Sequence, residues 1–238
     1  MGIDNGYQFI YRPDLHTYMS ELHVDSVTKS FGIKRILTDI YISCRQGEIV
    51  GLLGRNGTGK STLLKIIFGS IHADSKFIRI GNKRINGITD NRKLINYLPQ
   101  DSFLPGHASV SKVIQLFCNK INTHLMVSNE QICSLIDKRI SHLSGGEKRL
   151  LEVFLIIHSD AKYILIDEPF NGIAPIYKAD IKTAIKQQSR EKGFIITDHV
   201  YRDVLDVASR IVLLRDGGTK EIANKEELKY YGYIPDIQ

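Results

Sequence analysis

GRNGTGKST, residues 54–62, is the stretch that decides the fold. It has the G-x-x-x-x-G-K-S spacing of a phosphate-binding loop, in which glycines let backbone N–H groups turn toward phosphate oxygens. In such a loop Lys60 reaches the β- and γ-phosphates, and Ser61 offers a hydroxyl to Mg²⁺. The nucleotide-binding residues predicted from this stretch are Gly54, Arg55, Asn56, Gly57, Thr58, Gly59, Lys60, Ser61 and Thr62.

The flanks of this loop supply the context that such a motif requires. Residues 48–53 form a short apolar run suited to a buried parallel strand. Residues 61–68 have helical apolar spacing and stop at Gly69. The loop is therefore predicted to lie between a strand and a helix N-terminus, where free N–H groups and the helix dipole favour an anion.

Bulk properties exclude several classes of protein. The 238 residues are 42% hydrophobic, with no apolar run near the 18 or so residues of a membrane span. The N-terminus lacks a signal-peptide pattern, so we expect a cytoplasmic protein. Cys44, Cys118 and Cys133 have no zinc-site spacing. The net charge of +6 includes no long basic run, and no nucleic-acid partner is expected.

The first half of the chain is organised around the loop. We expect residues 1–20 to be an N-terminal extension and residues 21–238 to be one domain. Alternating apolar residues between 21 and 46 predict antiparallel strands, and a later strand ends at Pro99, leaving Gln100 in a loop.

Residues 101–142 are predicted to form a small helical insertion. Val113, Ile114, Leu116 and Phe117 are expected to share one apolar face, and Ser128 to open a second helix through a capping box.

The second half carries three further polar patterns. Residues 143–147 read Leu-Ser-Gly-Gly-Glu and precede an apolar helix predicted from about Lys148 to Ser159. Residues 163–167 are a buried strand that brings Asp167 and Glu168 to its end. A helix over about 176–191 and a strand over 193–197 follow, with His199 beyond that strand.

The order of these motifs resembles the nucleotide-binding subunit of ATP-binding-cassette (ABC) transporters, over about residues 21–232. The resemblance implies an α/β P-loop NTPase fold, with a mixed-sheet core, an antiparallel β-subdomain and the helical insertion. It implies an ATPase that powers membrane transport, at the inner face of the membrane when assembled.

The family pattern also implies roles for single residues. Phe31 is expected to stack on adenine, with a core aromatic as the alternative. Asp167 would hold Mg²⁺ together with Ser61, and Gln100 would lie near that ion and the membrane partner. Glu168 would polarise the attacking water, and His199 would contact Glu168 and the γ-phosphate. The expected catalytic set is Lys60, Glu168 and His199.

Ser144, Gly145, Gly146 and Glu147 are implied to complete the ATP site of a second subunit. Since the chain carries one set of motifs, the resemblance implies a homodimer, or a heterodimer with a second nucleotide-binding subunit, beside a membrane-embedded subunit.

The C-terminal half is similar to the subgroup containing the lipopolysaccharide-export ATPase and branched-chain amino acid importers. One departure is Ala174, where the family usually has an aspartate, and this puts communication between the paired sites in doubt. Two alternatives stay open: a soluble cassette ATPase without a membrane partner, and a nucleotide-gated module that barely hydrolyses.

Overall fold

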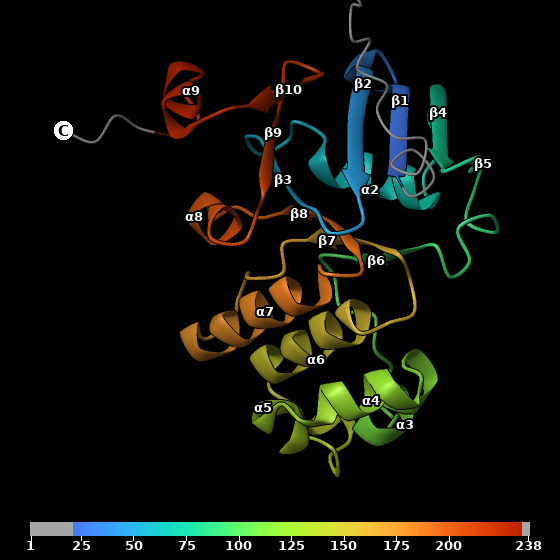
Figure 1. Ribbon diagram of the computed structural model, residues 1–238, viewed down its shortest axis with the longest axis vertical. Helices are drawn as coiled ribbons and strands as arrows, with labels where there is room; N and C mark the ends of the chain where they lie inside the picture. Colours follow the sequence, from blue (N-terminus) through green and yellow to red (C-terminus); the bar gives the residue numbers. More distant parts are fainter. Residues whose placement is uncertain (1–20, 235–238) are drawn as a thin grey trace, which may run out of the picture.

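The computed structural model describes residues 21–234, so the predicted extension 1–20 lies outside the described residues. The centre is a six-stranded sheet in the order β10-β9-β3-β8-β7-β6 (Figure 1). All neighbours pair in parallel except β10, which is antiparallel to β9. The strands are β3 (Ile49–Leu53), β6 (Ile95–Leu98), β7 (Tyr163–Asp167), β8 (Gly193–Thr197), β9 (Arg210–Arg215) and β10 (Gly218–Ile222).

A second sheet is antiparallel and has the order β2-β1-β4-β5. Its strands are β1 (Glu21–Phe31), β2 (Lys34–Arg45), β4 (Ser75–Ile80) and β5 (Lys83–Arg84). Helix α2 (Lys60–Phe68) packs in one apolar cluster with residues of both sheets, burying Leu63, Leu64, Ile66 and Ile67. The antiparallel strands predicted before the loop are therefore present, and they cover one face of the central sheet.

The other face of the central sheet is covered by α6 (Gly145–Ile157) and α7 (Pro175–Gln188) (Figure 1). Ile164 and Ile166 point to this side, whereas Leu165 belongs to the cluster around α2. Both faces of β7 are thus buried, which explains why its sequence is a continuous apolar run instead of an alternating one.

Three short helices, α3 (Val110–Phe117), α4 (Lys120–Val127) and α5 (Glu130–Cys133), and a 3₁₀ turn η1 (Ile140–His142) occupy the predicted insertion. Val113 and Ile114 are buried, but Leu116 is 81% exposed, so the prediction that it shares their face is wrong. The predicted cap at Ser128 is also wrong. Asn129 accepts the Ile132 N–H and opens α5, whereas Ser128 ends α4.

The C-terminal part comprises α8 (Tyr201–Leu205), the β9–β10 hairpin and α9 (Lys225–Tyr230). It packs around a small apolar cluster that includes Leu53, Leu213, Leu228 and Ile234. Within residues 21–234, no helix has the length and apolar character needed to span a membrane.

The sheet order places the site. Parallel strands bring their carboxyl ends to the same edge, and here those ends lead into residues from distant parts of the sequence. The 54–62 loop follows β3, His199 follows β8, Glu168 follows β7 and Gln100 follows β6. Four segments predicted separately therefore meet at one edge.

Candidate nucleotide-hydrolysis site

The loop between β3 and α2 requires glycine at Gly59. Its φ is +104°, and a Cβ there would lie 2.7 Å from Ile36 and 2.9 Å from Leu37. No side chain caps the N-terminus of α2, which begins directly after Gly59. The first N–H groups of this helix are consequently available to an anion.

Lys60 opens α2 with its side chain folded back over the loop. Its Nζ donates hydrogen bonds to the carbonyl oxygens of Gly54, at 2.7 Å, and Arg55, at 3.2 Å. Burial lowers the pKa of Lys60, while Glu168 and Asp167 oppose this effect. The ammonium group is thus held at the loop by weak neutral acceptors, ready to exchange them for phosphate oxygens.

Asp167 lies at the end of β7 and is 1% exposed. Its carboxylate accepts hydrogen bonds from the Ser61 hydroxyl at 3.1 Å and from the Tyr97 hydroxyl at 3.0 Å. Burial, together with the nearby Asp167, raises the pKa of Tyr97, which stays a donor. The structure brings Ser61 and Asp167 together as predicted, and adds Tyr97, which the sequence did not single out.

Glu168 follows with φ +55°, a conformation that is uncommon for a residue with a side chain and that is often found at functional sites. Its carboxylate lies 2.5 Å from His199 Nε2 and accepts hydrogen bonds from Gln100, at 2.9 Å, and Asn171, at 3.3 Å. Burial raises the pKa of Glu168, and His199 opposes the rise. Residues of its own loop and of the loops after β6 and β8 therefore fix the direction of this carboxylate.

Two buried charged side chains, Arg149 and Asp198, hydrogen-bond to the backbone of the loops that carry Gln100, Glu168 and His199. The Arg149 guanidinium donates to the carbonyl oxygens of Pro99, Asp167 and Glu168, at 2.8, 2.8 and 3.0 Å. A single arginine from α6 thereby ties the ends of β6 and β7. Its position in an apolar helix was the signal in the sequence, because a charge inside a buried helix needs partners.

Asp198 holds the ends of β7 and β8 in the same way. Its carboxylate is 1% exposed and accepts the Phe170 N–H and the Val200 N–H, each at 3.0 Å. Phe170 lies two residues after Glu168, and Val200 directly follows His199. The sequence placed Asp198 at the end of a strand, but which backbone it binds follows only from the adjacency of β7 and β8.

A cavity of about 410 Å³ opens above the loop. Its lining combines the predicted phosphate-binding and catalytic groups: Phe31, Ile36, Asn56, Gly57, Gly59, Lys60, Ser61, Thr62, Gln100, Glu168 and His199. Phe31 is 52% exposed at this cavity, so the alternative of a core aromatic does not hold. Arg55 and Thr58 instead line a neighbouring pocket.

The segment 144–147 does not line this cavity, although Gly145 lines an adjoining pocket of about 320 Å³ together with Gln100 and Glu168. Ser144 caps α6, accepting the Glu147 N–H at 3.2 Å while the Glu147 carboxylate accepts the Ser144 N–H at 2.8 Å. Helix α6 therefore starts three residues earlier than predicted. Within residues 21–234, none of Ser144, Gly145, Gly146 and Glu147 lines the cavity above the loop.

A family model and curated relatives match the sequence of this chain. Residues 37–171, more than half of the chain, match the family model described as "ABC transporter". The chain is 33% identical to the lipopolysaccharide export system ATP-binding protein LptB of Haemophilus influenzae, over 89% of this chain and 96% of that protein. It is 32% identical to LptB of Escherichia coli K12, over 84% and 88%.

Solved structures agree on the fold. A structure titled "Structure of ATP binding subunit of ABC transporter" superposes with a TM-score of 0.78 at 20% identity, covering 90% of this chain and 94% of that one. The ADP conformation of MJ1267, an ATP-binding cassette of an ABC transporter, gives 0.73 at 22% identity, covering 92% and 97%. The chain thus belongs to the ABC transporter family, as an ATP-binding subunit with an ABC-type ATPase fold and activity.

Proposed function

We propose that the chain hydrolyses ATP at a site completed by a second nucleotide-binding subunit, and that the resulting closure drives a membrane-embedded partner. One observation carries the proposal: the cavity above residues 54–62 contains Lys60, Glu168 and His199 but no residue of 144–147. Gly145 lines only the adjoining pocket beside Gln100 and Glu168, and this separation from Lys60 supports the proposal that a second chain completes the site.

The residues around Ser61 fit Mg²⁺. Mg²⁺ prefers oxygen ligands and commonly binds through one or two carboxylates plus substrate phosphates. Ser61 and Asp167 supply such oxygens side by side, and Gln100 approaches from the next strand end. The described residues hold no cluster of three or more His, Cys, Asp or Glu side chains suited to a metal. When bound, Mg²⁺ would help to neutralise charge on the phosphates.

The side chains then divide the work of in-line water attack on the γ-phosphoryl group. Lys60 and the free N–H groups of α2 position the phosphates. Glu168 accepts a hydrogen bond from the attacking water and orients it, and its raised pKa suits a proton acceptor. His199, 2.5 Å from Glu168, holds that carboxylate in place. Phe31 offers its exposed ring to the adenine.

The second half of the site is supplied in trans. Ser144 and Gly145 are exposed at the N-terminus of α6, where backbone N–H groups are directed outward. A two-fold pair places this helix end against the γ-phosphate held by the other chain, and symmetry repeats the contact. The partner is a second copy of this chain or a sister subunit.

The helical insertion offers a surface to the membrane partner. An apolar groove of about 160 Å³ is lined by Phe103, Leu104, Pro105, Ala108, Lys112, Val113, Leu116 and Phe117. It follows directly on the Gln100 loop, whose Phe103 N–H is held by the buried Glu152. We infer that a short apolar helix of the membrane subunit docks here, at the inner face of the membrane. The 81% exposure of Leu116 supports this docking, because an apolar side chain on a groove favours a partner.

The substitution Glu168→Gln tests the shared site. It keeps the shape of the side chain but removes the proton acceptor, so kcat falls by about 10²–10⁴ while ATP still binds. The trapped complex elutes as a dimer in size-exclusion chromatography with ATP and Mg²⁺. Glu226→Gln, an exposed change on α9, is the matched control and retains full activity. A Glu168→Gln protein that binds ATP yet remains monomeric contradicts the shared site.

A further inference from the structure

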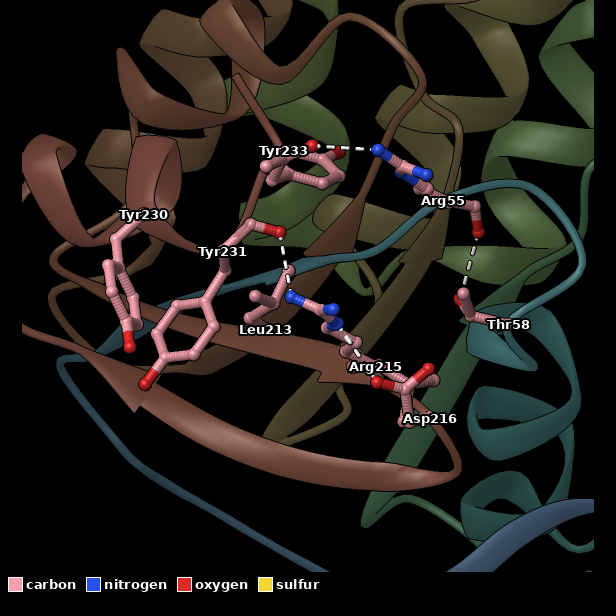
Figure 2. A pocket seen from close by; sticks show the side chains of 10 residues that line it. Arg55, Thr58, Leu213, Arg215, Asp216, Tyr230, Tyr231 and Tyr233 are labelled. Carbon is pink, nitrogen blue, oxygen red and sulfur yellow. Dashed lines mark hydrogen bonds and ion pairs between the residues drawn. The ribbon is translucent and has the colours of Figure 1, made fainter. Parts of the chain in front are cut away.

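The C-terminal residues Tyr230–Ile234 lie against the phosphate-binding loop. Figure 2 shows the Arg55 side chain reaching from the loop to this segment, beside Tyr233. The pocket between them has a volume of about 370 Å³ and is lined by Arg55, Thr58, Leu213, Leu214, Arg215, Asp216, Tyr230, Tyr231, Gly232 and Tyr233. None of these described residues, including Arg55 and Tyr233, also lines the nucleotide cavity.

Two polar contacts join the segment to the loop. Arg55 Nη2 donates to the Gly232 carbonyl oxygen at 2.9 Å. Burial raises the pKa of the Tyr233 phenol, and the phenol's polar contact with the Gly54 backbone N–H, which favours the phenolate, opposes that rise. Since Gly54 and Arg55 are the first two residues of the loop, both contacts act at the point where it leaves β3.

Tyr233 also contacts the helix that follows His199. Its ring meets the ring of Tyr201 edge to face, with centroids 6.2 Å apart and planes at 72°. Tyr201 begins α8, two residues after His199. One C-terminal side chain therefore contacts both the start of the phosphate-binding loop and the helix that follows the histidine.

The segment is held firmly enough to position the loop. Gly232 has φ +63°, and its N–H donates to the Lys229 carbonyl oxygen while the Tyr233 N–H donates to that of Leu228. These bonds close α9 and fix the direction of the Gly232 carbonyl. Ile234 is 7% exposed, within the same apolar cluster as Leu53. The carbonyl that receives Arg55 is thus placed by the fold.

We propose that Tyr233 and Arg55 are positioning residues for the phosphate-binding loop, acting through Gly54 on the N–H groups that receive ATP. This rests on the proposed function only in that ATP is the ligand of the loop. Loss of either polar contact leaves the loop less ordered before binding, so the free-energy cost of ordering the loop is added to the cost of binding ATP.

The test compares Tyr233→Phe and Arg55→Gln with Tyr230→Phe. Tyr233→Phe keeps the ring on Tyr201 and removes the hydroxyl, whereas Tyr230 is 84% exposed and serves as the matched control. Calorimetric titration with ATP and Mg²⁺ is expected to give a Kd roughly two- to tenfold higher for each test variant, the effect of one lost hydrogen bond. KM rises with Kd, kcat at saturating ATP stays within about twofold, and the control matches the wild type.

A merely structural role would lower the midpoint of urea unfolding and leave the Kd of the folded protein unchanged. An unchanged Kd for both test variants, with folding verified by circular dichroism, overturns the inference. Because binding to the monomer is measured directly, the result does not depend on pairing or hydrolysis. Wild-type protein that binds ATP but neither pairs nor hydrolyses it contradicts the proposed function alone.

Discussion

Glycine lies at the N-terminus of both helices, as Gly59 before α2 and as Gly145 at the first position of α6, yet the two helices differ in how their N–H groups are satisfied. Helix α2 starts after Gly59 without a side-chain cap, beside Lys60. Helix α6 starts after Ser144 with a complete capping box to Glu147, and the Lys138 ammonium lies 2.9 Å from that glutamate. One helix end is unsatisfied and faces the cavity, whereas the other is stabilised by its own residues and is exposed.

The presence or absence of a side-chain cap distinguishes a helix end that needs a bound anion from one that does not. The α2 end needs an anion to satisfy its N–H groups and has a lysine to hold it. The α6 end forms without a ligand, because Ser144 and Glu147 replace one. In the proposed pair it meets a phosphate held by another chain, and the exposure of Ser144 and Gly145 is consistent with that approach.

Lys60→Ala is expected to have the largest effect, and it changes the N-terminus of α2. Removing the ammonium leaves the N–H groups of α2 as the main phosphate donors, so we expect ATP affinity to fall by about 10- to 100-fold, the effect of a lost charge-assisted hydrogen bond. Titration with ATP and Mg²⁺ measures it. Lys65→Ala, on the same helix, is the control and retains the wild-type Kd. Equal affinity for Lys60→Ala and wild type would refute the assignment of the loop.

Ser144→Ala disturbs the other helix end. Loss of the cap is expected to lower the free energy of unfolding by about 1 kcal/mol in urea titration. ATP affinity of the monomer stays unchanged because Ser144 does not line the nucleotide cavity. ATP-driven pairing in the Glu168→Gln background weakens. Ser141→Ala, an exposed change one turn earlier, is the control; a higher monomer Kd for Ser144→Ala would place the two helix ends in one site.

Ala174→Asp is expected to have the smallest effect, and it changes the start of a third helix, α7. Ala174 is the N-cap of α7 and supplies no side-chain acceptor. Aspartate at that position is expected to raise the free energy of unfolding by about 0.5–1 kcal/mol, measured by urea titration. Ala174→Leu, which adds bulk without an acceptor, gives no gain. If aspartate also gives none, the start of α7 does not lack a cap.

The residue at position 174 shows how a sequence departure changes meaning in the structure. From the sequence, Ala174 raised doubt about communication between paired sites. In the structure it is also a helix start without a cap, followed by Pro175 at the first helical position, which favours that start by itself. Stability of α7 and pairing of subunits are therefore two separate consequences of one substitution.

The sequence predicted strands and loops best where the chemistry is local. Strand β8 spans 193–197 as predicted, because a run this short, rich in isoleucine and aromatic residues, is too short for a helix and suits a buried strand. The start of α5 was misplaced by one residue since Ser128 and Asn129 are both good caps, and packing of Ile132 chose between them. Leu116 was assigned to the core because its spacing along the helix matches that of buried residues. In the structure it instead lines an open groove.

The sequence alone determined the chemical motifs of this protein: a glycine-bounded loop with Lys60 and Ser61, two carboxylates at the end of a strand, and a separate Leu-Ser-Gly-Gly-Glu segment. Spacing along one chain suffices for such motifs because their geometry is local. Only the tertiary structure decided what surrounds them. Tyr97, Arg149, Asp198 and Tyr233 reach the site through the adjacency of strands and the packing of the C-terminal segment, which depend on contacts between residues far apart in sequence.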